Sequence, residues 1–346
     1  MTMDEIRSID PAGMYDLLKD FPGQVRKAVT IGNAARGSSS RGIRNIVLCG
    51  LGGSAIGGDL LRSYLAGELR IPFIVNRTYT LPAFVGPGTL VIVSSYSGNT
   101  EETNAAHREA LKRKARILCI TSGGRTAKLA GRGPVIHVPG GFPPRSALGY
   151  SFFPLLISLA KAGFITDRSR AIRETIALLE ERTRVYADPA AANNPALRLA
   201  EELRGRIGVI YSGAEHFDSV STRWRGQIAE NGKSLAFGHV IPEMNHNELV
   251  GWKVLREPMR EMQVFILRDR DDHKRVRLRM EFTKRVLGEH TGRITEVWSE
   301  GSSLLARMFS LVSLGDWMSF YLAMLHGVDP TPVTVIDRLK QELAGA

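Results

Sequence analysis

The sequence predicts an α/β protein with two parallel β-sheets, each flanked by helices. Three observations lead to this fold class: short β-branched runs alternate with helix-length segments, the pattern stops at a Pro- and Asn-rich segment at 188–195, and it then begins again. A chain of 346 residues is long enough to bury two hydrophobic cores. We therefore expect two units, each a sheet wound with helices.

The predicted strands are short apolar runs, found in both halves of the chain. They cover 43–49, 73–75, 90–93, 117–120 and 135–138 in the first half, and 207–211, 263–267 and 294–298 in the second. The predicted helices cover 14–31, 150–161, 168–186, 302–326 and 333–343. The opening strand of each half ends in a glycine turn, which suggests a diverged duplication.

These elements divide the chain into four segments. We expect an N-terminal helical segment at 1–34, a first α/β unit at 35–165, a helical linker at 166–198 and a second α/β unit with a C-terminal helix at 199–346.

Composition argues against fibrous and disordered classes, and we expect no secretory signal. Hydrophobic residues make up 43% of the chain, which suits a globular protein. The first eleven residues carry Asp4, Glu5 and Asp10 and no apolar core, so they do not form a signal peptide. We expect no stretch as long as a membrane span, and we expect Cys49 and Cys119 to be small buried hydrophobic residues. The chain is therefore predicted to be cytoplasmic, with no membrane partner.

The basic charge does not by itself predict a nucleic-acid partner. The formal net charge is +11, and the densest basic cluster lies at 268–285. Acidic residues are interleaved with its cations and no recognised nucleic-acid motif accompanies it, so we interpret it as a strand end and a solvated helix. The excess charge could instead steer anionic substrates or reflect an arginine-rich coding bias.

A loop rich in hydroxyl groups follows the predicted strand at 90–93. It carries Ser95, Ser97 and Thr100, with Gly98 allowing close backbone approach, and a helix is predicted to begin at Glu101. Free N–H groups and the helix dipole favour an anion at such a position. The alternative is that these hydroxyls only cap the helix.

A second glycine-rich turn follows the first predicted strand and carries Gly52, Gly53 and Ser54. A dinucleotide site would place an acidic residue at the end of the next strand, but Asn76 and Arg77 stand there. Because loops at the carboxyl ends of neighbouring parallel strands converge, we expect this turn to form a second wall of the same anion pocket.

Together the two loops resemble a sugar isomerase (SIS) domain, a flavodoxin-like fold that binds phosphosugars. Four further motifs resemble those of the bifunctional phosphoglucose/phosphomannose isomerases: Glu230-Asn231-Gly232-Lys233, 242–248, 144–147 and 329–340. The resemblance covers nearly the whole chain. It implies two flavodoxin-like SIS subdomains, and it implies that Gly52, Gly53, Ser54, Ser95, Ser97 and Thr100 bind the substrate phosphate.

The resemblance also implies a reaction. Glucose 6-phosphate or mannose 6-phosphate is expected to interconvert with fructose 6-phosphate through a cis-enediolate, with no cofactor and no metal. A carboxylate suits the required proton transfer between C1 and C2, and the resemblance implies that Glu230 supplies it. Taken alone, Glu230 could simply begin a surface turn. The alternatives are an isomerase of another phosphosugar and a non-catalytic phosphosugar-sensing module.

Three further side chains take roles implied by the resemblance. His246 is expected to assist ring opening from the neighbouring subunit of a homodimer, Arg145 to stabilise the enediolate, and Lys340 to assist ring opening. Ser146 follows Arg145 where the family often has alanine. Either Thr331 or Thr334 is expected to allow both C2 epimers. His246 could equally be structural, and a metal site at His246 lacks further ligands nearby.

Overall fold

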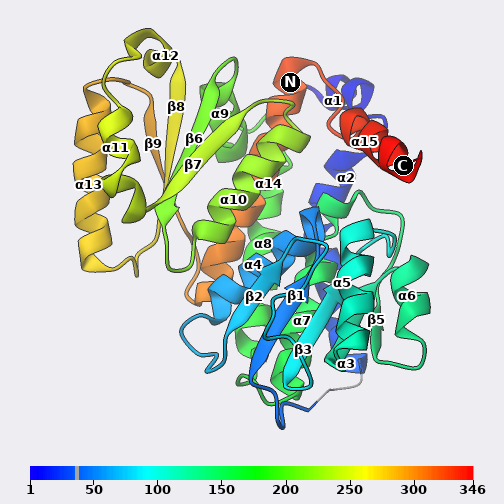
Figure 1. Ribbon diagram of the computed structural model, residues 1–346. Coiled ribbons are helices and arrows are strands. Elements are labelled where there is room, and N and C mark those ends of the chain that lie inside the picture. Colours follow the sequence, from blue (N-terminus) through cyan, green and yellow to red (C-terminus); the bar gives the residue numbers. More distant parts are fainter. Residues whose placement is uncertain (36–38, 346) are drawn as a thin grey trace.

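The computed structural model describes residues 1–35 and 39–345, and these residues form two parallel sheets (Figure 1). The first has the order β2-β1-β3-β4-β5 and the second the order β7-β6-β8-β9. The strands are β1 (Asn45–Cys49), β2 (Phe73–Asn76), β3 (Thr89–Ser94), β4 (Arg116–Thr121), β5 (Val135–His137), β6 (Ile207–Gly213), β7 (Ala236–Ile241), β8 (Met262–Arg268) and β9 (Ile294–Trp298). Every neighbouring pair is parallel. The predicted α/β class is confirmed.

Helices connect the strands and cover the sheets, so a central strand such as β3 is buried along its whole length. In the first unit these are α4 (Gly52–Leu65), α5 (Glu101–Lys112), α6 (Gly124–Ala130) and α7 (Leu148–Lys161). In the second they are α10 (Asp218–Glu230), α11 (Glu248–Gly251), α12 (Arg256–Arg260) and α13 (Lys274–Gly288). The densest basic cluster is thus the end of β8 and helix α13, as predicted.

The strand order of each sheet reverses at one point, its topological switch point. In the first sheet β2 lies on one side of β1 and β3 on the other, so the crevice opens between the carboxyl ends of β1 and β3. In the second sheet the equivalent point lies between β6 and β8. Ligands of open α/β sheets bind at such points, which directs attention to the loops there.

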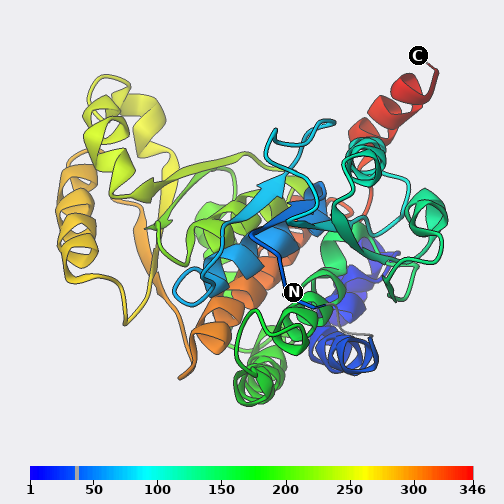
Figure 2. The same cartoon turned by 60° about the horizontal axis from the view of Figure 1, so that its bottom comes forward.

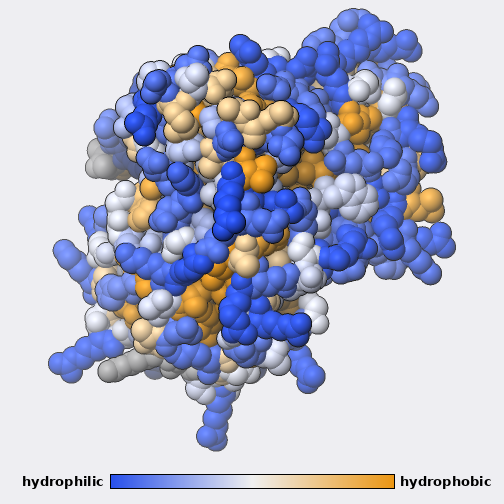
Figure 3. All heavy atoms as spheres, turned by 180° about the vertical axis from the view of Figure 1, so that it is seen from behind, coloured by the Kyte–Doolittle hydropathy of each residue, from blue (hydrophilic) through white to orange (hydrophobic). Residues whose placement is uncertain are grey.

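Helix α14 (Leu304–His326) lies between the two sheets (Figures 1 and 2) and packs against α8 (Ser169–Tyr186), α9 (Pro195–Leu203) and α10. We expected no stretch of membrane-span length, but α14 is long and apolar enough for one by length and composition. However, 94% of its apolar window is buried within the protein. On the face seen from behind, hydrophobic patches are separate and surrounded by hydrophilic residues (Figure 3). The apolar side chains of α14 are therefore explained by packing at the centre of the molecule.

The helix joins the two halves into one core. A single cluster of buried side chains includes Ile46 and Ile92 of the first sheet, Ile210 and Phe265 of the second, and most of α14. Across this core Phe309 of α14 packs edge-on against a phenylalanine of α7, with ring centroids 4.9 Å apart.

The N-terminal region differs from the prediction. Instead of one helix at 14–31, it forms α1 (Met3–Ile9), α2 (Met14–Lys19) and α3 (Phe21–Ala34). The break falls at Asp20, and α3 begins with the pair Phe21-Pro22. Proline is favoured in the first turn of a helix because it has no N–H to leave unpaired, so Pro22 starts a new helix here.

The sequence analysis missed strand β7. Gly238 and His239 interrupt its apolar run. β7 is also an edge strand, and an edge strand is less buried and therefore less hydrophobic in sequence than a central strand. A Cβ atom on Gly238 would collide with the carbonyl group of Ile210 in the neighbouring strand. The glycine that weakens the strand signal is therefore required by the close approach of β6.

A substitution at the contact between α10 and α14 tests the importance of this packing. A Cβ atom on Gly315 would lie 2.5 Å from Cδ1 of the fully buried Trp224, so Gly315→Ala forces that indole to move. We expect a loss of roughly 1 to 3 kcal/mol in the free energy of unfolding, measured by denaturant titration. The matched control is Gly226→Ala in α10, where a Cβ meets nothing within 4 Å. It should be neutral or stabilising, and equal losses in both variants would contradict the packing argument.

Candidate active site

The two hydroxyl- and glycine-bearing loops meet at the switch point between β1 and β3. Ser54, in the first turn of α4, accepts a hydrogen bond on Oγ from the backbone N–H of Tyr96 (3.2 Å). The hydroxyls of Ser95 and Thr100 lie 3.0 Å apart, while Ser97 Oγ accepts the N–H of Asn99 within its own turn (3.2 Å). The structure therefore brings the predicted phosphate-binding residues to one place.

The helix-capping alternative for these hydroxyls is not what the structure shows. Thr100 is the N-cap residue of α5, yet its side chain makes no capping hydrogen bond and contacts Ser95 instead. Leu51, the N-cap residue of α4, has no side-chain acceptor at all. The first-turn N–H groups of both helices consequently have no capping side chain, which is the arrangement that suits an anion.

Arg145 stands next to these two loops. It lies in the 3-10 turn η1 (Pro144–Ser146), which packs so tightly on the start of α4 that a Cβ on Gly53 would lie 3.2 Å from the Arg145 backbone nitrogen and collide with the Pro144 carbonyl. Glycine at position 53 therefore fixes the spacing between the phosphate loop and the arginine.

The Arg145 side chain is buried and reaches into the second half of the chain. Its side chain is only 4% exposed, and Nη1 lies 3.5 Å from Oε2 of Glu230, the last residue of α10. Nε donates to Asn231 Oδ1 (2.6 Å), and Nη2 donates to the carbonyls of Pro330 (2.7 Å) and Thr331 (2.9 Å). Burial lowers the pKa of the guanidinium, and the Glu230 carboxylate opposes that shift.

Lys233 is a cation at this site that the sequence analysis did not single out. Its Nζ donates to the carbonyls of Glu230 (2.6 Å), Pro330 (3.1 Å) and Pro332 (2.6 Å). Three acceptors occupy all three ammonium protons, so Lys233 holds the segment 329–332 in place and has no proton to direct at a ligand. The only sequence signal was its position after Asn-Gly; its backbone has a positive φ of 51°.

The segment 329–332 brings one of the two candidate threonines to the site. Thr331 contacts Arg145 through its carbonyl, and among the described residues its buried Oγ1 has no hydrogen-bond partner. Thr334 is instead the exposed first residue of α15 (Thr334–Gly345). Of the two candidate threonines, only Thr331 therefore contacts Arg145.

His246 and Lys340 do not join this cluster within one chain. His246 ends the exposed 3-10 turn η2 (Glu243–His246) beside α11, and α11 and α15 lie on opposite sides of the molecule in both views (Figures 1 and 2). The Lys340 side chain is 67% exposed and pairs with Asp337 of its own helix (3.1 Å). One chain thus brings together the predicted phosphate loops, Arg145 and Glu230, but leaves these two predicted residues apart.

The equivalent switch point of the second sheet has the opposite charge. Asp269, Asp271 and Asp272 follow β8, and Arg307 of α14 donates to the first two at 2.8 and 2.6 Å. Burial raises the pKa of Asp272 to about 6. Carboxylates at this position repel a phosphate, so only the first switch point is suited to an anionic substrate.

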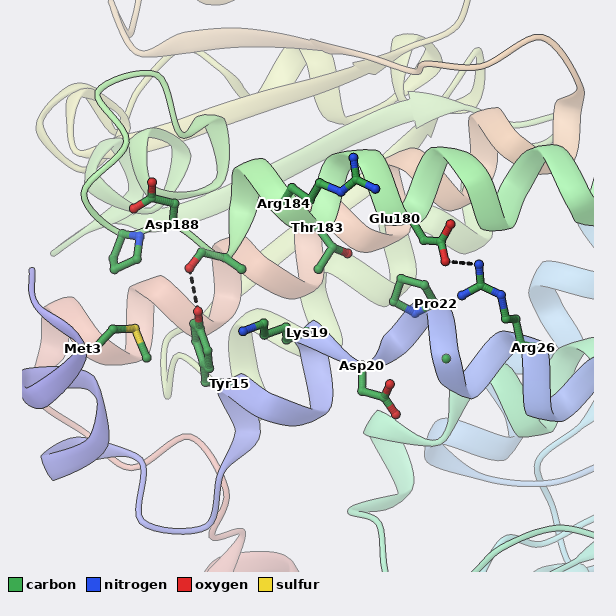
Figure 4. A pocket seen from close by; sticks show the side chains of 13 residues that line it. Met3, Tyr15, Lys19, Asp20, Pro22, Arg26, Glu180, Thr183, Arg184 and Asp188 are labelled. Carbon is green, nitrogen blue, oxygen red and sulfur yellow. Dashed lines mark hydrogen bonds and ion pairs between the residues drawn. The ribbon is translucent and has the colours of Figure 1, made fainter.

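A cavity of about 710 Å³ lies away from this site, between α2, α3 and α8 (Figure 4). Two of its charged residues, Arg26 and Glu180, pair with each other, and the Tyr15 hydroxyl donates to the carbonyl of Ala187 (2.7 Å). Its lining mixes both signs of charge. Volume alone does not identify a phosphosugar site, and the convergent loops at β1 and β3 locate the candidate site instead.

Known proteins match the chain along its length. The SIS domain family matches residues 41–130, and the family described as the bacterial phospho-glucose isomerase C-terminal SIS domain matches residues 192–343. A bifunctional phosphoglucose/phosphomannose isomerase from Caldicellulosiruptor bescii is 43% identical over 335 residues, which cover 96% of this chain and 99% of that protein. The chain belongs to the bifunctional phosphoglucose/phosphomannose isomerase family.

Other members of this family and solved structures agree. The bifunctional phosphoglucose/phosphomannose isomerase of Aquifex aeolicus is 37% identical, with 87% of this chain and 90% of that protein covered. The crystal structure of a hypothetical protein from Thermus thermophilus superposes with a TM-score of 0.74 at 18% identity, covering 96% of this chain and 91% of that one. The second of these comparisons shows a shared fold. The resemblance drawn from the sequence motifs is confirmed.

The raised pKa of Asp272 predicts that the stability of this isomerase family member depends on pH. Its pKa in the folded protein, about 6, lies above the ordinary value of 3.8, so the folded state binds this proton more tightly than the unfolded state does. Its ionised form is therefore destabilising at neutral pH. Asp272→Asn should raise the free energy of unfolding by roughly 1 to 3 kcal/mol near pH 7.5 and by less near pH 5, measured by denaturant titration at both pH values.

Asp271→Asn is the control for this measurement, because it removes a carboxylate that is 66% exposed from the same cluster. It should give no comparable gain at neutral pH. A pH-independent effect of Asp272→Asn would contradict the role given to its proton.

Proposed function

We propose that the chain interconverts glucose 6-phosphate or mannose 6-phosphate with fructose 6-phosphate through a cis-enediolate. The observation that carries the proposal is the pairing of Glu230 with Arg145 beside a convergent pair of phosphate loops. Family membership supports the same substrates, since the relatives are named as phosphoglucose/phosphomannose isomerases.

The phosphate is held by the two loops at the first switch point. First-turn N–H groups of α4 and α5 donate to its oxygens, as do the hydroxyls, and both helix dipoles favour its charge. The binding residues are Gly52, Gly53, Ser54, Ser95, Ser97 and Thr100. This end of the substrate does not react, so its role is to hold C1 and C2 in position near Glu230.

Glu230 carries the proton. In the open-chain aldose it removes the proton from C2; the C–H electrons form the C1=C2 double bond, and the C1 carbonyl oxygen becomes the enediolate oxygen. A proton then passes from the C2 hydroxyl to the C1 oxygen, the C2 oxygen re-forms a carbonyl, and the electrons of the double bond take the same carbon proton back from Glu230 at C1, which gives the ketose. The Arg145 cation, 3.5 Å from the carboxylate, stabilises the negative charge of the enediolate. Thr331 beside it offers a small hydrogen-bonding group near C2, which accommodates either epimer.

The active form is a homodimer in which each chain supplies His246 to the site of the other. Two exposed apolar surfaces support an association of copies. One is on α15, with Val335, Ile336, Leu339 and Leu343; the other surrounds α11 and α12, with Val250, Val254 and Leu255, where Val254 is 80% exposed. Exposed apolar groups of this extent are typical of protein interfaces. In the site completed by the dimer, His246 and Lys340 assist the opening of the pyranose ring.

The enzyme acts in the cytoplasm, without a resident cofactor or metal, and without a nucleic-acid or membrane partner. The metabolic role of the family supports this location. Both cysteines are free and buried, as predicted, and burial raises the pKa of each thiol to about 12, so they remain protonated and unreactive.

The proton-transfer role is tested by Glu230→Gln in a coupled assay on both aldose phosphates. The amide keeps the size of the side chain but cannot accept the proton, so kcat should fall by about 10²- to 10⁴-fold while KM changes little. Glu201→Gln on the exposed surface of α9 should have no effect. Normal turnover by Glu230→Gln would exclude this carboxylate as the proton carrier.

The same assay tests the substrate. If the wild-type protein turns over neither aldose phosphate, the proposed function is wrong, and aminosugar and pentose phosphates become the substrates to test. A relative from Sulfolobus acidocaldarius, named D-glucosamine-6-phosphate 4-epimerase, is 28% identical over 59% of this chain, so an aminosugar phosphate is the first of these to try.

Sharing of His246 is tested by mixing two inactive variants. Glu230→Gln and His246→Ala chains, unfolded together and refolded, should form mixed dimers in which one site has both groups intact. Random pairing predicts recovery of roughly a quarter of wild-type activity for a two-fold symmetric dimer. Each variant refolded alone is the control. No recovery, with dimers confirmed by sedimentation, would exclude the sharing of His246 between subunits.

A further inference from the structure

We infer that Asn231 is a positioning residue for the isomerisation: it holds the Arg145 guanidinium at the distance from Glu230 that the enediolate requires. The inference rests on the proposed function and deepens it. Asn231 directly follows Glu230 at the end of α10 and is completely buried. It is the one side chain among the described residues that accepts a hydrogen bond from Arg145 Nε, at 2.6 Å.

Asn231 is itself fixed by a buried chain of hydrogen bonds. Its Nδ2 donates to Ser319 Oγ (3.0 Å), and that hydroxyl donates to the carbonyl of Asp316 (2.7 Å), one turn earlier in α14. The Ser319 hydroxyl proton is thus already donated to a carbonyl, and the hydroxyl oxygen can only accept a hydrogen bond from the Asn231 amide. The amide must therefore point its nitrogen at Ser319 and its oxygen at Arg145.

The same turn of α14 also holds the backbone of Arg145. Asp316 accepts two hydrogen bonds from the buried Arg223, at 2.9 and 2.7 Å, and Arg223 Nη2 also donates to the Arg145 carbonyl (3.1 Å). The main chain and the side chain of Arg145 are therefore both connected to Asp316. Because α14 is buried from Leu305 to Met324, these connections give Arg145 little freedom to move.

A neutral acceptor suits this position better than a carboxylate does. An aspartate at position 231 would also accept the Nε hydrogen bond, but its charge would cancel that of the guanidinium. The amide oxygen orients Arg145 and leaves its positive charge for Glu230 and the enediolate. Without any acceptor at 231, the remaining partners at 330 and 331 draw the guanidinium toward the C-terminal segment.

The test is a double-mutant cycle between positions 231 and 145, with kcat and KM for fructose 6-phosphate measured separately. Asn231→Ala and Asn231→Asp should each lower kcat by about 10- to 100-fold, because small displacements or charge changes near the reacting atoms have effects of this size. KM should stay within about threefold, since the phosphate loops are untouched. A merely structural role would change thermal stability without this separation of kcat from KM.

The cycle identifies the route of the effect. In an Arg145→Lys background the Nε donor is gone, so adding Asn231→Ala should cause no further loss of kcat. Full additivity of the two losses would show that Asn231 acts independently of Arg145 and would overturn the inference. Unchanged kcat in both Asn231 variants, with an active wild-type protein, would also overturn it while leaving the proposed function intact.

Ser319→Ala provides a second variant in case substitution of the buried Asn231 prevents folding. It removes the hydroxyl that orients the Asn231 amide but leaves residues 231 and 145 unsubstituted. We expect a smaller fall in kcat, of about three- to tenfold, again without a comparable change in KM and again absent in the Arg145→Lys background. Ser310→Ala is the matched control. This serine of α14 donates in the same way to a carbonyl three residues earlier, but it makes no hydrogen bond to Asn231 or Arg145. It should leave kcat unchanged.

Discussion

The burial of one cation at the junction of two sheets constrains the rest of this molecule. Arg145 belongs to the first half of the chain, yet every side-chain hydrogen bond it makes goes to the second half or to the C-terminal segment. A buried guanidinium without partners is strongly destabilising. The two halves must therefore dock in one arrangement, and that arrangement also brings Glu230 to the phosphate loops.

The two halves have similar topology and different chemistry at equivalent points. Where the first sheet presents hydroxyls and free helix N–H groups, the second presents a group of aspartates paired with Arg307. If the two arose by duplication, the second pocket has exchanged ligand binding for a structural ion-pair network, and the second unit contributes to the site through the end of α10 instead. In the proposed function, the first unit therefore binds the phosphate and supplies Arg145, and the second supplies Glu230.

The sequence predicted what depends on local pattern. The buried run at 90–93 followed by Ser95, Ser97 and Thr100 located both a central strand and the anion loop, because strand burial and turn chemistry are written in neighbouring residues. Strand β7 escaped because its glycine is required by a tertiary contact and not by the strand itself. The family motifs identified Glu230 and Arg145, but not that they lie 3.5 Å apart. Asn231 and Lys233 went unassigned, since their partners are distant in the chain and only the folded structure brings them together.

Helix α14 has a consequence for how substrate enters. Many enzymes with two α/β units close around a ligand by bending at a thin connection between lobes, with hinges at loops or element ends. Here a helix of 23 residues is buried among side chains of both units, within one continuous core. A lobe-closing motion would have to break that core, which close-packed interiors resist. The two units are therefore not expected to close around the sugar of the proposed reaction, and its admission and release would depend on smaller movements at the rim of the site.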